Sequence, residues 1–324
     1  MRRLITLFAM TVVLVAQAEG QEGGTQPDSN LGAATPVVTD STRPAPQVPY
    51  RTDPWGARRD YALAVGEVLL VNGIVWMYNE FPRGANFTQI NPRSWYNNFS
   101  DGWTYDDNHF ANNMFAHPYH GSLYYSAARA NGFNYWVALP TALLGSGFWE
   151  CCGETHPPAI NDWIATGVGG SAIGEMLYRV SSTVLDNTAT GSERVWREIG
   201  AGLLNPVRGF TRLVTGRVGK VQPNPENPLD HIPNQLLNTL RLGGRWVADS
   251  GRLDEGGNTN DSKAYTGMFE IDFQFGSPFA DDRRKPFDFF SFRLGMYSRE
   301  KKPVGLLGIR GNLWATDLNR SDGN

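Results

Sequence analysis

The spacing of apolar and polar positions changes once along the chain, close to residue 220. Before that point apolar residues recur at helical spacing, and after it they alternate with polar residues every second position. The first long apolar run, residues 60–77, is apolar on nearly every face and is interrupted only by Glu67 and Asn72. This pattern predicts a helix buried in protein or in a membrane, although the run is shorter than the roughly 20 residues that a simple span requires.

Residues 58–220 are predicted to form a helical domain of about five helices. Three further helices are expected over residues 114–131, 133–150 and 162–185, the last capped by Asn161 or Asp162. A fourth is expected to begin at the capping box Thr190-x-x-Glu193 and to end or kink at Asn205-Pro206, whereas residues 84–101 resemble a loop. Within the third of these helices, Gly170-x-x-x-Gly174 permits close contact between helices.

Residues 236–324 are predicted to form antiparallel β-hairpins after a proline-rich connector at 221–235. Four alternating segments have the length and pattern of outer-membrane hairpins, but a sheet packed on helices gives the same alternation. Four strands are too few to close a barrel, because about eight is the smallest number observed. The predicted fold class is therefore α+β, with either an open sheet that helices cover or part of an outer-membrane-type β-barrel.

The N-terminal segment resembles a signal peptide. Residues 1–18 combine Arg2 and Arg3 with an apolar stretch and a small-x-small cleavage site, Ala16-Gln17-Ala18. Residues 19–57 are rich in small and polar residues and are predicted to be a disordered linker. We therefore expect an exported protein, located at the outer membrane or on its periplasmic face.

The net charge argues against nucleic-acid binding, and the two cysteines exclude a disulfide-stabilised scaffold. A net charge of −3 gives no global basic field for nucleic acid, although the basic segment Arg208, Arg212, Arg217 and Lys220 could lie on anionic headgroups or be a solvated face. The only cysteines, Cys151 and Cys152, are adjacent, so the chain is not a disulfide scaffold. Because a bond between neighbouring cysteines is strained, two free buried thiols are expected.

Candidate chemistry is concentrated in residues 101–175, where polar groups interrupt long apolar runs. His117 and His120 share one helical face, and Glu150 ends an apolar helix where the helix dipole disfavours a carboxylate. Asp162 opens the next helix after a short loop, so His117, His120, Glu150 and Asp162 are expected to lie together. With Glu175 they are the candidate catalytic residues.

These residue types suit acid–base chemistry or a metal site, but their spacing is not that of a known metal motif. A buried hydrogen-bond network that locks the helices together would use the same residues. No cofactor follows from the sequence, and the metal is unidentified.

Several motifs in this stretch resemble a bacterial domain-of-unknown-function family, number 3943. They are Trp103-x-x-Asp106, Phe110, Asn113, His117-Pro118, His120-Gly121, Ala128-Arg129, Gly132, Gly145-Ser146, Trp149-Glu150, Asn161-Asp162 and Gly174-Glu175. The resemblance implies an exported cell-envelope protein with a helical N-terminal part and a β-rich remainder, and it implies no activity.

The sequence therefore favours an uncharacterised cell-envelope protein, a structural or assembly component whose partner is outer-membrane lipid. One alternative is an envelope hydrolase that acts on lipid or glycan through the histidines and carboxylates. Another is a pore or transport component, for which a lumen bearing Arg241, Arg245, Arg293 and Arg310 would be suitable. No nucleic-acid partner is expected, and the sequence identifies no protein partner.

Overall fold

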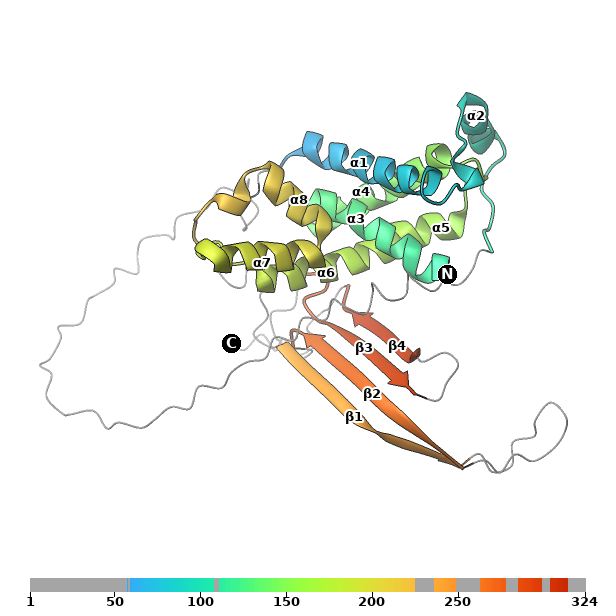
Figure 1. Ribbon diagram of the computed structural model, residues 1–324. Helices are drawn as coiled ribbons and strands as arrows, with labels where there is room; N and C mark the ends of the chain where they lie inside the picture. Colours follow the sequence, from blue (N-terminus) through green and yellow to red (C-terminus); the bar gives the residue numbers. More distant parts are fainter. Residues whose placement is uncertain are drawn as a thin grey trace, which may run out of the picture. The chain divides into compact units, whose positions relative to one another are not determined.

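A computed structural model describes residues 57, 59–107, 111–224, 236–248, 263–277, 285–298 and 304–313. Within them, helices precede a four-stranded sheet, so the predicted α+β class is confirmed (Figure 1). The predicted signal peptide, nearly all of the predicted linker and most of the predicted connector lie outside the described residues.

The helical part contains more helices than the five or so expected. A long apolar helix, α1, is followed by a short one, α2, in a segment that the sequence suggested to be a loop. The helix expected over residues 162–185 is divided into α5 and α6. The bounds are α1 Tyr61–Glu80, α2 Pro92–Ser100, α3 His117–Ala130, α4 Tyr135–Phe148, α5 Ile160–Ile164, α6 Gly170–Val184, α7 Gly191–Leu204 and α8 Pro206–Val214.

Three π-helical segments adjoin these helices. The segment η2 (Asn112–Ala116) leads into α3, η3 (Trp149–Gly153) continues α4, and η4 (Ala165–Gly169) joins α5 to α6. Such segments are uncommon and are frequently found at functional sites. Two short 3₁₀ turns, η1 (Asn86–Thr88) and η5 (Arg217–Gly219), complete the helical part that the structure describes.

The predicted helix caps were partly wrong. The N-cap of α5 is Ala159, so neither Asn161 nor Asp162 caps that helix. Thr190 is the N-cap of α7, but its side chain accepts no capping hydrogen bond. The start of α2 does form a capping box, in which Asn91 accepts from the backbone of Ser94 and Ser94 accepts from that of Asn91.

Helix α3 packs against α1, α4, α6 and α8, and glycines allow its closest contact. A Cβ atom on Gly121 would lie 1.7 Å from the carbonyl oxygen of Thr166 and 3.1 Å from the Cα of Gly170. One turn further along, a Cβ on Gly174 would lie 2.6 Å from the ring of Tyr125. The close helix contact predicted from Gly170-x-x-x-Gly174 is thus confirmed.

The strands β1 (Leu236–Ala248), β2 (Lys263–Phe275), β3 (Phe290–Tyr297) and β4 (Val304–Gly311) form one antiparallel sheet in chain order. The predicted alternation is confirmed in the register, where Leu240, Ile271, Leu294 and Leu307 are paired in turn across the strands. The sheet is open as described. Phe275, Phe287 and Phe290 belong to the same apolar cluster as helix residues such as Tyr135.

Candidate functional site

His117, Glu150 and Asp162 lie together, and we call these three residues the His–acid cluster. Each offers one donor atom, and these atoms all lie within 4.8 Å of one another. Glu150 and Asp162 are 1% and 3% exposed, whereas the side chain of His117 is 20% exposed. Three of the four residues that the sequence placed together are therefore brought together, at the edge of a buried region.

The π-helical segments and the glycine contact position this cluster. His117 begins α3 directly after η2, Glu150 lies in η3, and Asp162 lies in the first turn of α5 just before η4. Since Gly121 and Gly170 let α3 and α6 touch, the residues one turn before them, His117 and Thr166, become neighbours. The three residues, which are far apart in sequence, thus meet where these three elements converge.

Each member of the His–acid cluster is held by a hydrogen bond on one side. His117 Nδ1 lies 3.2 Å from Thr166 Oγ1, and Glu150 Oε2 accepts from the backbone N–H of Ala159 at 2.9 Å. Asn161 Nδ2 donates to Asp162 Oδ1 at 3.0 Å. Between His117 Nε2 and Asp162 Oδ2 the distance is 3.6 Å, which is longer than a hydrogen bond.

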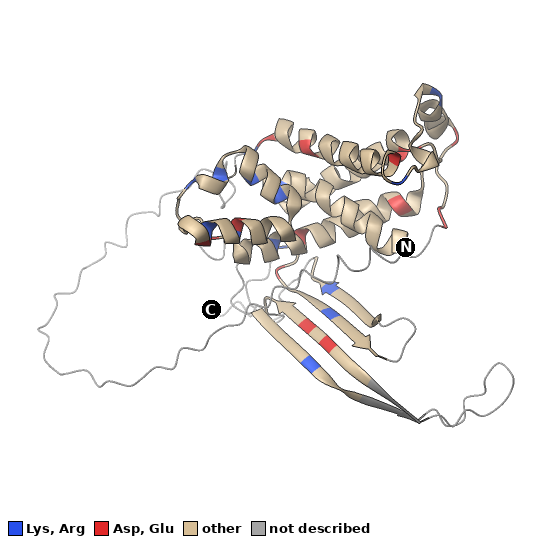
Figure 2. Ribbon diagram, viewed as in Figure 1, with Lys and Arg blue, Asp and Glu red and all other residues tan. Residues whose placement is uncertain are grey.

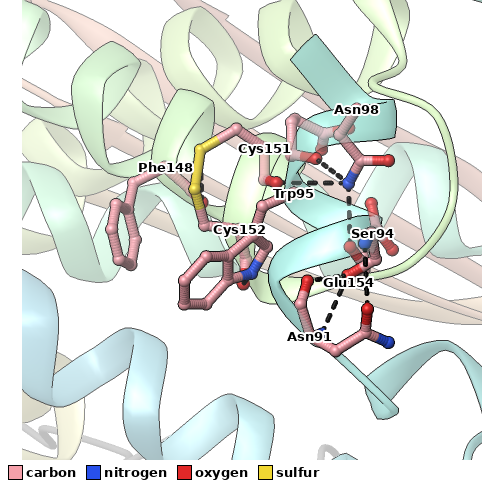
Figure 3. The surroundings of a disulfide bond; sticks show 9 residues. Asn91, Ser94, Trp95, Asn98, Phe148, Cys151, Cys152 and Glu154 are labelled. Carbon is pink, nitrogen blue, oxygen red and sulfur yellow. Dashed lines mark hydrogen bonds between the residues drawn. A yellow bond between two sulfur atoms is a disulfide. The ribbon is translucent and has the colours of Figure 1, made fainter. Parts of the chain in front are cut away.

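Helix α2 fixes the segment η3 that carries Glu150 (Figure 3). Trp95 Nε1 donates to the carbonyl of Cys152 at 3.1 Å, and the buried Asn98 Nδ2 approaches the carbonyls of Cys151 and Glu154 at 3.2 and 2.9 Å. The backbone from Glu150 to Glu154 is therefore tied to a helix that is distant in sequence.

The prediction of two free thiols is wrong in this structure, because Cys151 and Cys152 form a disulfide (Figure 3). Both cysteines lie in the π-helical segment η3. The bond directly follows Glu150 in the segment that α2 contacts, so it forms part of the framework around the cluster.

Burial and neighbouring acids change the proton affinity of the carboxyl groups. Burial, together with Asp106 and Asp162, raises the pKa of Glu150 to about 7, and burial and Asp106 raise the pKa of Asp162 to about 7. Burial and the neighbouring acids Glu150, Asp162 and Asp106 raise the pKa of Glu154 to about 9. Burial lowers the pKa of His117. Groups that exchange protons near neutrality are suited to general acid–base catalysis.

His120 lies beside the cluster but has other partners. Its Nε2 is 2.7 Å from the hydroxyl of Tyr124, which in turn donates to Asn72 Oδ1 of α1 at 2.7 Å. Its ring also meets the ring of Trp149 edge-on. Burial and the charge of His117 lower the pKa of His120 to about 3, so this residue serves as a neutral link between α3 and α1.

Glu175 lies in a different network, which we call the Glu175 network. Arg129 Nε and Arg179 Nε lie 2.8 and 3.0 Å from its carboxylate, and the Tyr125 hydroxyl donates to it at 2.6 Å. The carboxylate is fully buried, yet the arginines lower the pKa of Glu175 to about 2. The structure thus separates this residue from the other candidate catalytic residues and surrounds it with closed ion pairs.

Two further residues of the site, Asp106 and Asn161, are not among those predicted from the sequence. The carboxyl of Asp106 shares a hydrogen bond with Asp162, and its backbone N–H donates to Asn161 Oδ1 at 2.9 Å. Asn161 also donates to the carbonyl of Asp106 at 2.9 Å. Both residues were part of the family motifs, but no local spacing connects positions so far apart in sequence.

The helical part buries several charged residues beside its apolar core and exposes many large apolar ones. Buried charges include Glu198, Arg208 and Arg212, which are 9%, 2% and 1% exposed. Charged residues occupy few positions on α1, α3 and α4 (Figure 2). Large apolar side chains are exposed on α1, α4, α7 and α8, among them Val65, Leu69, Ile74, Trp136, Leu144, Trp196, Leu203, Leu213 and Val214.

Both interpretations of the basic segment are wrong for three of its four residues, since Arg208, Arg212 and Arg217 are buried, whereas Lys220 is exposed. Arg208 donates to Ser181 and Ser182 of α6, and Arg212 pairs with Glu198 of α7 at 2.6 Å. The sequence could not reveal these contacts, because the partners come from other helices.

Helix α1 is long and apolar enough to cross a membrane by length and composition, and 28% of its most apolar window is buried. It is the only such helix in the described part of the chain. A single helix of this kind is weak evidence, because core helices and signal sequences have the same properties.

Comparison with known proteins gives one match. No curated protein and no solved structure is similar to the chain. Residues 102–207 match the model of one family, and this range contains the whole His–acid cluster and the Glu175 network. Residues 102–207 of the chain are thus similar to the family described as a domain of unknown function (DUF3943).

Proposed function

We propose that the chain is a structural or assembly component of the cell envelope, exported and associated with the outer membrane, whose helical part contacts lipid. The observation that carries this proposal is that many large apolar side chains are exposed while several charged side chains are buried. Apolar groups such as Leu144, Trp196 and Leu203 are 75%, 70% and 61% exposed, whereas Arg212 and Glu175 are 1% and 0% exposed.

Physical chemistry favours lipid as the environment of such a surface. Exposed apolar patches of this kind are unfavourable in water and mark interaction surfaces. Helices in a lipid environment gain little from burying apolar groups against each other, so small residues and polar contacts hold them together. The Gly121–Gly170 contact and the buried Arg212–Glu198 pair provide both.

Flotation with lipid vesicles tests the proposal. Purified full-length protein, exchanged from detergent into vesicles, should float with them in a density gradient. Trp196→Lys and Leu203→Lys place charges on the exposed face of α7 and should lower the floating fraction severalfold. Ser192→Lys changes an exposed polar position of the same helix and is the matched control.

The variants should keep the wild-type melting temperature in detergent, which separates loss of lipid contact from loss of fold. A wild-type protein that stays soluble and monomeric without detergent or lipid would contradict the proposal. If the protein instead forms an oligomer of defined size without detergent, its exposed apolar side chains form contacts between copies of the chain. Fractionation of the producing cells tests the location, and recovery in the soluble periplasmic fraction would contradict it.

The His–acid cluster favours a second candidate, an envelope hydrolase acting on lipid or glycan. Its supporting observation is that buried carboxyl groups with pKa values near 7 lie against a partly exposed histidine. Hydrolysis of lipid or glycan extracts by wild type, lost in Asp162→Asn, would support this candidate. The pore alternative has less support, because Arg241 and Arg293 pair with Glu270 and Asp272 on neighbouring strands.

A further inference from the structure

We propose that the His–acid cluster is a binding site for one divalent transition-metal ion, with His117, Glu150 and Asp162 as its protein ligands. This inference concerns the donor atoms alone and does not depend on the membrane proposal. The three donors come from three separate elements, η3, α3 and α5, and converge to within 4.8 Å.

The distance between His117 and Asp162 fits two ligands of one ion better than an ion pair. His117 Nε2 and Asp162 Oδ2 are 3.6 Å apart, too far for a hydrogen bond. Two ligands that each lie about 2.1 Å from an ion in tetrahedral geometry are about 3.4 Å apart. A cation between them would also compensate the two carboxylates, whose burial as charges is otherwise unfavourable.

Hydrogen bonds behind the ligands orient each of them. Thr166 holds the Nδ1 side of His117, which leaves Nε2 toward Asp162. Asn161 holds Oδ1 of Asp162, which leaves Oδ2 toward His117. The Ala159 N–H holds one oxygen of Glu150. Outer partners of this kind fix ring and carboxylate orientation in protein metal sites.

The donor set indicates the class of ion. One imidazole nitrogen with carboxylate oxygens suits zinc, iron or manganese, whereas magnesium prefers oxygen ligands in octahedral geometry and keeps several waters. Three protein ligands leave a coordination position for water or substrate. The partial exposure of His117 provides access from solvent.

Equilibrium dialysis of the untagged full-length protein against Zn²⁺ alone, with metal analysis, tests the site. The wild type should bind one Zn²⁺ per chain and should bind Mg²⁺ at least 10-fold more weakly. Glu150→Gln and Asp162→Asn should each weaken Zn²⁺ binding by more than 10-fold. Thr166→Val, which removes only the outer partner of His117, should weaken it by about 10- to 100-fold.

His156→Gln is the matched control, because His156 is exposed and lies outside the cluster, and it should bind Zn²⁺ like the wild type. Circular dichroism without metal shows which variants fold. If Glu150→Gln or Asp162→Asn does not fold, the Zn²⁺ affinity of Thr166→Val tests the site. The proposal is wrong if the wild type takes up no Zn²⁺ at micromolar concentration. It is equally wrong if the folded Glu150, Asp162 and Thr166 variants retain wild-type affinity.

Discussion

Two buried glutamates in neighbouring parts of the helical region have opposite surroundings. Glu175 contacts two arginines and a tyrosine, and its pKa is lowered to about 2. Glu150 lies among other acids, accepts one backbone hydrogen bond, and its pKa is raised to about 7. Both side chains are almost completely inaccessible, so burial alone does not distinguish their roles.

The difference lies in how each negative charge is compensated. A buried carboxylate with well-placed cationic partners is satisfied, and removal of one member leaves the others unpaired. A buried carboxyl group among like charges needs a proton or an external cation. We therefore assign to Glu175 the role of holding the helices together, and to the His–acid cluster that of binding a ligand.

Glu175→Gln should have the largest effect on stability. It leaves Arg129 and Arg179 without their shared carboxylate, and breaking a buried pair in this way costs about 3–5 kcal/mol of unfolding free energy. Denaturant or thermal unfolding in one detergent buffer measures the loss. Glu193→Gln removes the exposed i,i+4 partner of Arg197 and should cost about 0–1 kcal/mol. Similar losses in both variants would contradict the role of the Glu175 network.

Acid should destabilise the protein through the same residue. Because the pKa of Glu175 is about 2 when folded and has an ordinary value of 4.5, its stabilisation is complete above pH 4.5 and is lost as pH falls toward 2. Unfolding free energy measured across this range should fall less steeply in Glu175→Gln than in the wild type. Asp186, whose pKa is also lowered to about 2 by hydrogen bonds, should leave a residual slope. If the unfolding free energy of the variant falls as steeply with pH as that of the wild type, Glu175 has the same pKa in the folded and unfolded states.

Asn98→Ala should have an intermediate effect, since it removes the contact between α2 and η3. The side chain is 4% exposed and donates to backbone carbonyls around Glu150, so its loss should cost about 1–3 kcal/mol. Asn97→Ala, at an exposed position of the same helix, should change stability by less than about 0.5 kcal/mol. If the two substitutions are equivalent, α2 does not support the His–acid cluster.

Glu150→Gln should have the smallest effect. The amide oxygen of glutamine can still accept from the Ala159 N–H, while the repulsion from neighbouring acids disappears. In the absence of metal we expect a change within about 1 kcal/mol, or a gain in stability. A loss of several kcal/mol would identify Glu150 as a structural residue.

The sequence predicted most of the fold because its signals are local. Alternation identified the strands, as the cross-strand pairs Arg241–Glu270 and Arg293–Asp272 on one face confirm. Helix α2 could also have been found, because Asn91 and Pro92 are a typical cap and first residue. Glu150 became a candidate because it ends an apolar helix, and its carboxylate accepts from the backbone N–H of Ala159.

The remaining features depend on contacts between distant segments. Arg212 pairs with Glu198 of another helix, and Glu175 pairs with Arg129 of α3, so their burial cannot be derived from one helix at a time. The His117–Thr166 contact depends on the meeting of Gly121 and Gly170. Helical spacing shows which residues share a face and does not show which other face they meet.

The most direct test of the account is the unfolding free energy of Glu175→Gln and Glu150→Gln, measured side by side in metal-free buffer. The account predicts that Glu175→Gln loses about 3–5 kcal/mol while Glu150→Gln stays within about 1 kcal/mol of the wild type. Equal losses, or a larger loss in Glu150→Gln, would contradict the assignment of one glutamate to structure and the other to a ligand site.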